Sequence, residues 1–129
     1  PPVRPIEEAR GKEILQIMGY FKEDDELEVF RKVLTHCEPM RWYPLFADII
    51  ARGNSKSKGI DQVLAYYGID LKDTMAFGDG GNDIPMLSHV GLGVAMGNAA
   101  PEVQAAARYV TTSVDEDGIM NALKHFNIL

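Results

Sequence analysis

From Gly53 to the C-terminus, short apolar segments alternate with segments in which apolar residues recur at helical spacing. This alternation predicts the order helix, strand, helix, strand, helix, strand, helix. Strands separated by helices form a parallel sheet, because each helix carries the chain back across a face of the sheet. The sequence therefore predicts an α/β fold with a parallel sheet flanked by helices.

Local signals place these elements more closely. Asn54 or Ser55 can cap a helix that ends at Gly68, where a C-terminal glycine cap belongs. Pro85 falls in the first turn of the following helix, the position at which helices best tolerate proline. The apolar face of the first helix is expected to consist of Ile60, Val63, Leu64 and Tyr67. The other expected elements are strands at 74–77, 92–96 and 109–111 and helices at 101–107 and 118–126.

Residues 12–51 predict a separate α/β unit. Residues 12–21 are apolar enough for a strand, and a helix with acidic residues at its start is expected over 24–34. A strand, a break at Pro44 and a second extended segment are expected over 39–51. The apolar face of that helix is expected to be Leu27, Phe30, Val33 and Leu34. We therefore predict two parts, residues 1–50, which begin with a Pro-rich connecting arm, and residues 51–129.

Composition excludes several classes of function. Lys and Arg total 13 against 19 Asp and Glu, and a formal net charge of −6 argues against nucleic acid or an anionic membrane as a partner. No apolar run approaches the ~18–20 residues of a membrane span. Cys37 is the only cysteine, which excludes an internal disulfide and cysteine-cluster metal sites. A reducing, cytoplasmic location is expected.

The run from Gly78 to Leu87 carries the clearest chemical signal. It follows an apolar strand and places Asp79 and Asp83 around a pair of glycines, at the sheet edge where open α/β folds bind ligands. Two crowded carboxylates repel unless one is protonated or a cation lies between them. Mg²⁺ fits this chemistry, because it typically takes one or two carboxylates together with substrate phosphate. The alternative interpretation is a turn that only caps the next helix.

A second signal is the pair of lysines, Lys56 and Lys58, at a predicted helix start. Cations there oppose the helix macrodipole, at a cost of roughly 0.3–1 kcal/mol each when exposed. A bound anion would offset this cost, since the free backbone N–H groups and the lysine then face the same negative charge. A solvated loop is the alternative, and the segment does not match a P-loop.

Two other segments resemble known motifs without matching them. Gly91–Gly97 looks like a dinucleotide fingerprint, but its last gap is too long, and its glycines are expected to permit close packing instead. Asp115–Gly118 resembles a DxDG nucleophile loop, but Ile119 stands where a hydroxyl residue is expected. Neither segment is expected to be catalytic.

The remaining polar candidates form no recognisable catalytic pattern. His36, His89 and His125 are scattered, and each is expected on the surface or in the core. The cluster Arg41–Pro44 could face a substrate or pack within the protein, and packing is the favoured interpretation.

Together, the lysine-bearing helix start and the GDGxND loop resemble motifs three and four of the haloacid dehalogenase-like (HAD) superfamily, most closely its Cof-type sugar phosphatases. The resemblance runs from about Arg41 to Leu129 and includes Gly91–Gly97 and the Asp117-Gly118 pair before the last helix. It implies that residues 51–129 are the C-terminal half of a Rossmann-like core. Residues 1–50 resemble, more weakly, part of that branch's α/β cap domain with a connecting arm.

The resemblance implies a Mg²⁺-dependent phosphatase that forms an aspartyl-phosphate intermediate on small phosphorylated metabolites, sugar phosphates above all. Lys56, 23 residues before Asp79, takes the place of the motif-three lysine ahead of Lys58 and would neutralise phosphate. Asp79 would ligate Mg²⁺, and Asp83 would hold the metal's shell or orient its ligands. Asn82 would hydrogen-bond substrate phosphate and touch the metal's shell. The implied catalytic residues are thus Lys56, Asp79 and Asp83, and the implied metal residues are Asp79, Asn82 and Asp83.

The sequence departs from the family in one respect, because it contains no DxDx[TV] loop, whose aspartate attacks phosphate in the family. We therefore expect this chain to be the C-terminal portion of a phosphatase, inactive alone, with the missing N-terminal part of the same protein as its partner. A non-catalytic binding or regulatory module that keeps the fold is the alternative. A P-type ATPase phosphorylation domain shares GDGxNDxPxL, but there membrane helices should follow.

Overall fold

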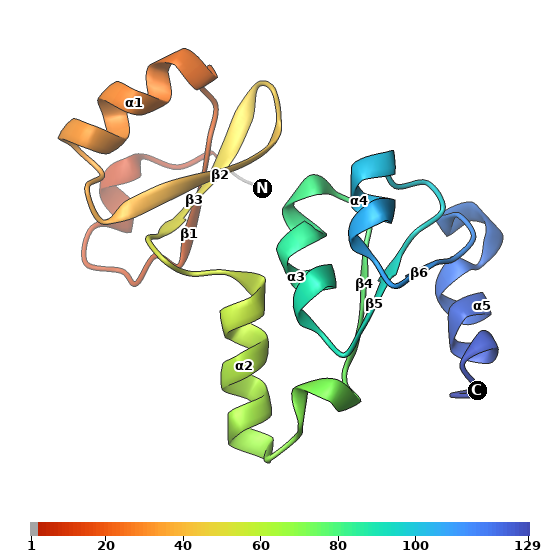
Figure 1. Ribbon diagram of the computed structural model, residues 1–129. Helices are drawn as coiled ribbons and strands as arrows, with labels where there is room; N and C mark the ends of the chain where they lie inside the picture. Colours follow the sequence, from red (N-terminus) through yellow and green to blue (C-terminus); the bar gives the residue numbers. More distant parts are fainter. Residues whose placement is uncertain (1–2) are drawn as a thin grey trace. The chain divides into compact units, whose positions relative to one another are not determined.

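The computed structural model describes residues 3–129, without the side chains of Glu26, Leu27, Val29, Arg31 and Trp42. The chain divides into two compact units between Gly53 and Asn54 (Figure 1). Each unit contains its own three-stranded sheet. Among the described helices, none is both long enough and apolar enough to cross a membrane.

The first unit is an antiparallel sheet with one helix. Its strands β1 (Gln16–Gly19), β2 (Cys37–Tyr43) and β3 (Phe46–Ala51) lie in the order β1-β3-β2, and α1 (Glu23–Lys32) connects β1 to β2. A short 3₁₀ turn, η1 (Ile6–Ala9), lies in the preceding arm. These elements confirm the predicted strand, helix and pair of extended segments.

The core of the first unit lies between α1 and the sheet, where Phe30, Ala47 and Ile49 are buried. The predicted apolar face of the helix was wrong at Val33 and Leu34, of which Val33 is exposed. The reason is that α1 ends at Lys32, so both residues follow the helix and do not share its face. Leu27, another residue of that predicted face, lies outside the described side chains.

The second unit is a parallel sheet in the order β4-β5-β6, formed by Met75–Gly78, Leu92–Ala95 and Tyr109–Val110. Its helices are α2 (Lys56–Tyr67), α3 (Ile84–His89), α4 (Pro101–Ala106) and α5 (Gly118–His125). Short 3₁₀ turns lie between them at η2 (Leu71–Asp73), η3 (Gly81–Asp83) and η4 (Val114–Glu116). This arrangement confirms the predicted α/β class and the alternating element order.

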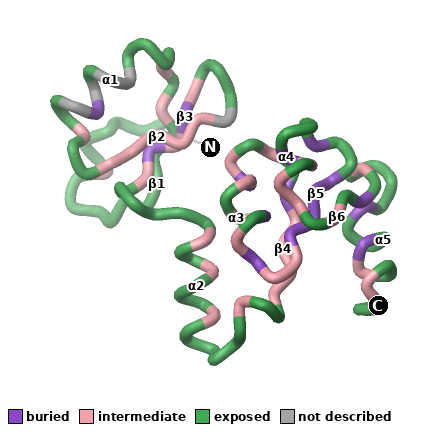
Figure 2. The backbone as a smooth tube through the Cα atoms, in the orientation of Figure 1, coloured by how far each residue is buried: buried purple, intermediate pink, exposed green. Residues whose placement is uncertain are grey.

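The core of the second unit gathers along β5, α3 and α4, where Figure 2 shows most of its buried positions. Leu87, Ala95, Ala99 and Val103 form one buried cluster there. Gly93 lies so close to α3 that a Cβ atom on it would come within 2.1 Å of the Leu87 carbonyl oxygen. The expectation that this glycine permits close packing is confirmed.

Helix α2 begins and ends where the sequence predicts. The Ser55 hydroxyl accepts a hydrogen bond from the Lys58 N–H, and Gly68 closes the helix in the left-handed region at φ 67°. Its predicted apolar face is largely exposed, since no residue of α2 is buried and Val63 and Tyr67 are more than half exposed. The described residues thus cover the apolar face of this helix only in part.

Candidate functional site

The acidic loop lies at the carboxyl end of β4. The strand runs directly into Asp79 and Gly80, after which the turn η3 leads into α3. A hydrogen bond of 2.9 Å from the Asp83 N–H to the Gly80 carbonyl closes this turn. Since β5 runs parallel to β4, the loop occupies the edge of the sheet at which the strands end.

The buried side chain of Asp83 holds the loop together through hydrogen bonds. It is only 6% exposed, and its Oδ2 accepts hydrogen bonds from the backbone N–H groups of Asp79 at 3.1 Å and Gly80 at 3.2 Å. Its Oδ1 accepts a hydrogen bond and ion pair from Lys56 Nζ. A buried carboxylate needs such partners, because leaving its charge unpaired away from water is costly.

Glycine is required at residue 78 because Asp83 packs against its backbone. A Cβ atom on Gly78 would come within 2.6 Å of the Asp83 Cβ and 3.1 Å of its Oδ2. Such contacts are too short for any side chain to accept without movement. The last residue of the strand therefore leaves the space that Asp83 occupies.

Opposing influences act on the pKa of Asp83. Burial raises the pKa, because it disfavours the charged form. The hydrogen bonds from Lys56, Gly80 and Asp79, together with the charge of Lys56, lower it by more than burial raises it. The net result is a pKa below the ordinary value of 3.8, so the carboxylate is ionised at neutral pH.

This lowered pKa predicts a loss of stability in acid. A depressed folded-state pKa means that the unfolded chain binds more protons, so the stability that Asp83 contributes is full above about pH 5 and falls as pH drops through the folded-state pKa. The difference in unfolding free energy between the wild type and Asp83→Asn should accordingly shrink between about pH 5 and pH 3. Urea unfolding at several pH values measures this difference, and a difference that stays constant would contradict the prediction.

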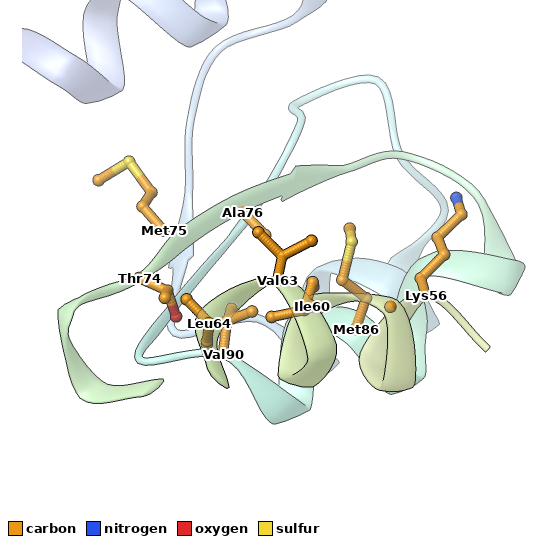
Figure 3. A pocket seen from close by; sticks show the side chains of 10 residues that line it. Lys56, Ile60, Val63, Leu64, Thr74, Met75, Ala76, Met86 and Val90 are labelled. Atoms are coloured by element: carbon orange, nitrogen blue, oxygen red, sulfur yellow. The ribbon is translucent and has the colours of Figure 1, made fainter. Parts of the chain in front are cut away.

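Lys56 reaches Asp83 from the first position of α2. Its side chain is 48% exposed, so the ammonium group contacts the carboxylate on one side and solvent on the other. Figure 3 shows this side chain extending from the start of the helix. Lys58, the other lysine of the predicted pair, is exposed and forms no ion pair within the described part of the chain. The structure therefore brings Lys56, and not Lys58, to the acidic loop.

Asp79 and Asn82 complete the set of loop residues that the sequence singled out. Asp79 is exposed, and Asn82 is half-buried with its Oδ1 so close to Gly80 that a Cβ atom there would lie 2.6 Å from it. Neither side chain forms a hydrogen bond with another residue of the 3–129 range. Both therefore present oxygen atoms that are available to a ligand.

The oxygen donors of this loop suit a hard cation such as Mg²⁺ but form only part of a site. Within residues 3–129, no three His, Cys, Asp or Glu side chains lie close enough together to hold a metal ion. Asp83 already accepts three hydrogen bonds, which leaves Asp79 as the available carboxylate. Mg²⁺ commonly binds through one or two carboxylates and fills its other positions with water and phosphate oxygens. The donor chemistry is thus compatible with Mg²⁺ if further ligands are supplied.

The other candidate segments lie elsewhere and have structural explanations. Asp117 occupies the left-handed region at φ 55° just before α5, and the Thr111 hydroxyl donates to the Gly118 carbonyl at 2.7 Å. The guanidinium of Arg41 donates to the backbone carbonyls of Phe21, Tyr43, Pro44 and Phe46. Arg41 therefore fastens the turn between β2 and β3, in agreement with the packing interpretation; the side chain of Trp42 lies outside the described residues.

The sequence did not predict the contact between His89 and Asp61. His89 Nε2 lies 2.7 Å from Asp61 Oδ1 and joins α3 to α2. No local motif marks this pair, because its two members lie on different helices. Only the packing of α2 against α3 brings them together.

The chain is similar to known proteins over most of its length. The model of the haloacid dehalogenase-like hydrolase family matches residues 2–123. The chain is 44% identical over 119 residues to YkrA of Bacillus subtilis, covering 92% of this chain and 46% of that protein. It is 33% identical to the 5-amino-6-(5-phospho-D-ribitylamino)uracil phosphatase YitU of Bacillus subtilis, covering 96% of this chain and 48% of YitU.

Solved structures show the same fold. The HAD subclass IIB sugar phosphatase BT4131 matches with a TM-score of 0.82 and 52% identity, covering 99% of this chain and 49% of that one. BT1666 of Bacteroides thetaiotaomicron, described as a phosphatase of the same superfamily, matches with a TM-score of 0.87 and 47% identity over 100% of this chain and 48% of its own. The chain thus spans about half the length of these relatives.

Proposed function

The chain belongs to the haloacid dehalogenase-like hydrolase family. We propose that it is about half of a longer Mg²⁺-dependent phosphatase that acts on small phosphate monoesters, with sugar phosphates as the favoured substrates. The observation that carries this proposal is the contact between Lys56 and the buried Asp83 at the carboxyl end of β4. That contact fixes a cation beside an acidic loop with free oxygen donors. The names of the sugar phosphatase BT4131 and of the phosphatase YitU support the choice of substrate class.

Lys56 and the three loop residues each have a distinct role in this proposal. The half-exposed ammonium of Lys56 faces the substrate phosphate and offsets its negative charge. Asp79 and the amide of Asn82 are the groups that would hold Mg²⁺ and the phosphate. Asp83, which is saturated with hydrogen bonds, keeps the loop and Lys56 in place and so orients the metal's ligands. Bound Mg²⁺ would supply charge neutralisation on the phosphoryl group.

The proposed reaction needs a nucleophile, and residues 1–129 contain no DxDx[TV] loop of the kind that supplies it in the family. In the first step a carboxylate oxygen bonds to phosphorus while the bond to the sugar oxygen breaks, and the leaving oxygen takes a proton from a general acid. In the second step the same group, now deprotonated, takes a proton from water as the water oxygen bonds to phosphorus; the bond between phosphorus and the carboxylate oxygen breaks, and inorganic phosphate leaves. We propose that the nucleophilic carboxylate and the acid lie in the N-terminal part of the same protein.

A groove beside β4 provides a surface on which the proposed N-terminal part can dock. A cavity of about 480 Å³ lies between α2 and β4 and is lined mainly by apolar side chains, among them Ile60, Val63, Leu64, Met75 and Met86 (Figure 3). In the described sheet β4 pairs only with β5, so its other edge carries unpaired peptide groups. Strands of parallel sheets are normally covered on both faces. An extended segment lying along β4 would cover this apolar surface and would place its end beside Asp79.

The proposal predicts that the 129-residue chain alone releases no phosphate. The assay contains Mg²⁺ and a panel of sugar phosphates. Phosphate release is expected only from the longer protein, meaning this chain together with the proposed N-terminal part, whether the two parts are joined or produced separately and mixed. Mg²⁺-dependent turnover by the isolated chain would overturn the claim that the nucleophile lies outside it. If the longer protein binds sugar phosphates without hydrolysing them, the protein is a binding module that keeps the fold.

A further inference from the structure

Two polar contacts join α2 to α3 beyond the ion pair of Lys56. The Ser57 hydroxyl donates to the Pro85 carbonyl at 3.4 Å, and Asp61 Oδ1 lies 2.7 Å from His89 Nε2. We call these two contacts the helix clasp. Ser57 and Asp61 are four residues apart on α2, and Pro85 and His89 are four residues apart on α3, so each pair lies about one turn apart on the same face of its helix.

The two contacts of the helix clasp and the ion pair of Lys56 with Asp83 all depend on the same axial alignment of α2 and α3. Lys56 directly precedes Ser57, and Asp83 lies just before Pro85, so the ion pair and the two clasp contacts follow one another along neighbouring helices. Four residues advance about 6 Å along either helix, which is why the contacts fall at matching levels. The same axial alignment that pairs Asp61 with His89 therefore brings Lys56 to Asp83.

Apolar packing alone fixes this alignment poorly. No residue of α2 is buried, and the cavity of about 480 Å³ lies along its apolar face. Hydrophobic contact is non-directional, whereas a hydrogen bond weakens steeply when its distance and angle change. A slide of α2 by one turn, about 5.4 Å, would keep much of its apolar contact yet carry the Lys56 ammonium away from Asp83.

We propose that Asp61 and His89 are a positioning pair that sets the axial register of α2 on α3 and thereby holds Lys56 at Asp83. The Ser57 contact is longer and contributes less to this alignment. Because the Asp61 side chain is 53% exposed and that of His89 is 29% exposed, the pair contributes little to overall stability, and its effect is geometric. The consequence for catalysis rests on the proposed function, whereas the register is a property of the chain itself.

The test compares three variants of the chain by NMR. Asp61→Leu removes the acceptor, Asp61→Asn keeps an Oδ1 acceptor at the same place, and Gln62→Leu changes an exposed neighbour on the same helix. The readout is the set of cross-peaks between the Lys56 side chain and the Asp83 β-protons. These cross-peaks should weaken in Asp61→Leu and keep their strength in Asp61→Asn and Gln62→Leu, while the melting temperature changes little.

The same variants in the longer protein connect register to catalysis. Asp61→Leu should lower kcat/KM by about two- to fivefold, the most that the loss of a half-exposed pair can shift the alignment of the two helices, and Asp61→Asn should stay close to the wild type. If the wild-type longer protein shows no phosphatase activity, the proposed function fails. The NMR result still shows whether Asp61 and His89 hold Lys56 at Asp83.

Two results would overturn the positioning role. The first is a folded Asp61→Leu chain in which the cross-peaks between Lys56 and Asp83 are as strong as in the wild type. If Asp61→Leu does not fold, His89→Ala is examined in its place by the same cross-peaks. Unfolding of both variants would show that the pair supports the whole second unit and not its register, which contradicts the proposal equally.

Discussion

Lys56→Met in the longer protein should lower kcat/KM for phosphate monoester hydrolysis by about 10²–10³-fold, the usual effect of removing one preorganised charge from a polar active site. Methionine keeps most of the length of lysine but neither offsets phosphate charge nor pairs with Asp83. The carboxylate of Asp83, only 6% exposed, then loses its cation and its hold on the loop weakens. Phosphate release under substrate-limiting conditions, with Mg²⁺ present, measures the effect.

Lys58→Met is the matched control for this prediction. It removes the same charge from the same helix, but Lys58 is exposed and stands outside the acidic loop. Its kcat/KM should stay close to that of the wild type. Equal losses in the two variants would mean that a diffuse positive potential, and not the contact with Asp83, accounts for the effect.

Gly78→Ala should destabilise the chain by about 2–3 kcal/mol, the cost of overpacking a site that cannot relax freely. The added Cβ atom would lie 2.6 Å from the Asp83 Cβ, so Asp83 would have to move away from the N–H groups of Asp79 and Gly80. The same substitution in the longer protein should impair phosphate release, since the loop would lose its internal acceptor. Urea unfolding of the chain measures the change in unfolding free energy.

Gly59→Ala provides a control with the opposite sign. Gly59 lies within α2, and a Cβ atom there meets nothing within 4 Å. Alanine in a helix interior is more favourable than glycine by about 0.5–1 kcal/mol, so this variant should be more stable than the wild type. Destabilisation of similar size in both variants would contradict the explanation by close packing at residue 78.

Much of the fold could be predicted because its signals are local. Ser55 and Gly68 bound α2 through hydrogen bonds and backbone conformations that involve only near neighbours in sequence. Pro85 marks the first turn of α3 in the same way. The extent of burial was harder to predict, because helical spacing shows which residues share a face but not what covers that face. The exposed Val63 and Tyr67 illustrate this limit.

The sequence named the residues of the candidate site, whose roles stay predictions, but it did not give most of their contacts. The pattern around Asp79 and Asp83 indicated an acidic loop, and the resemblance to the HAD motifs favoured Lys56 over Lys58. The sequence did not indicate that both oxygens of Asp83 are occupied by donors, since one of these donors comes from a different helix. The pairing of His89 with Asp61 could not be predicted for the same reason.

The connections within the parallel sheet have a consequence for how the second unit folds. Met75 pairs with Leu92 and Val94 pairs with Tyr109, so each strand pairing closes a loop of fewer than 20 residues. Folding is fast when contacts are close in sequence, because little loop entropy is lost before they form. Residues 75–110 can therefore assemble early, and a strand arriving at β4 from a distant part of a longer polypeptide would join a template that has already formed.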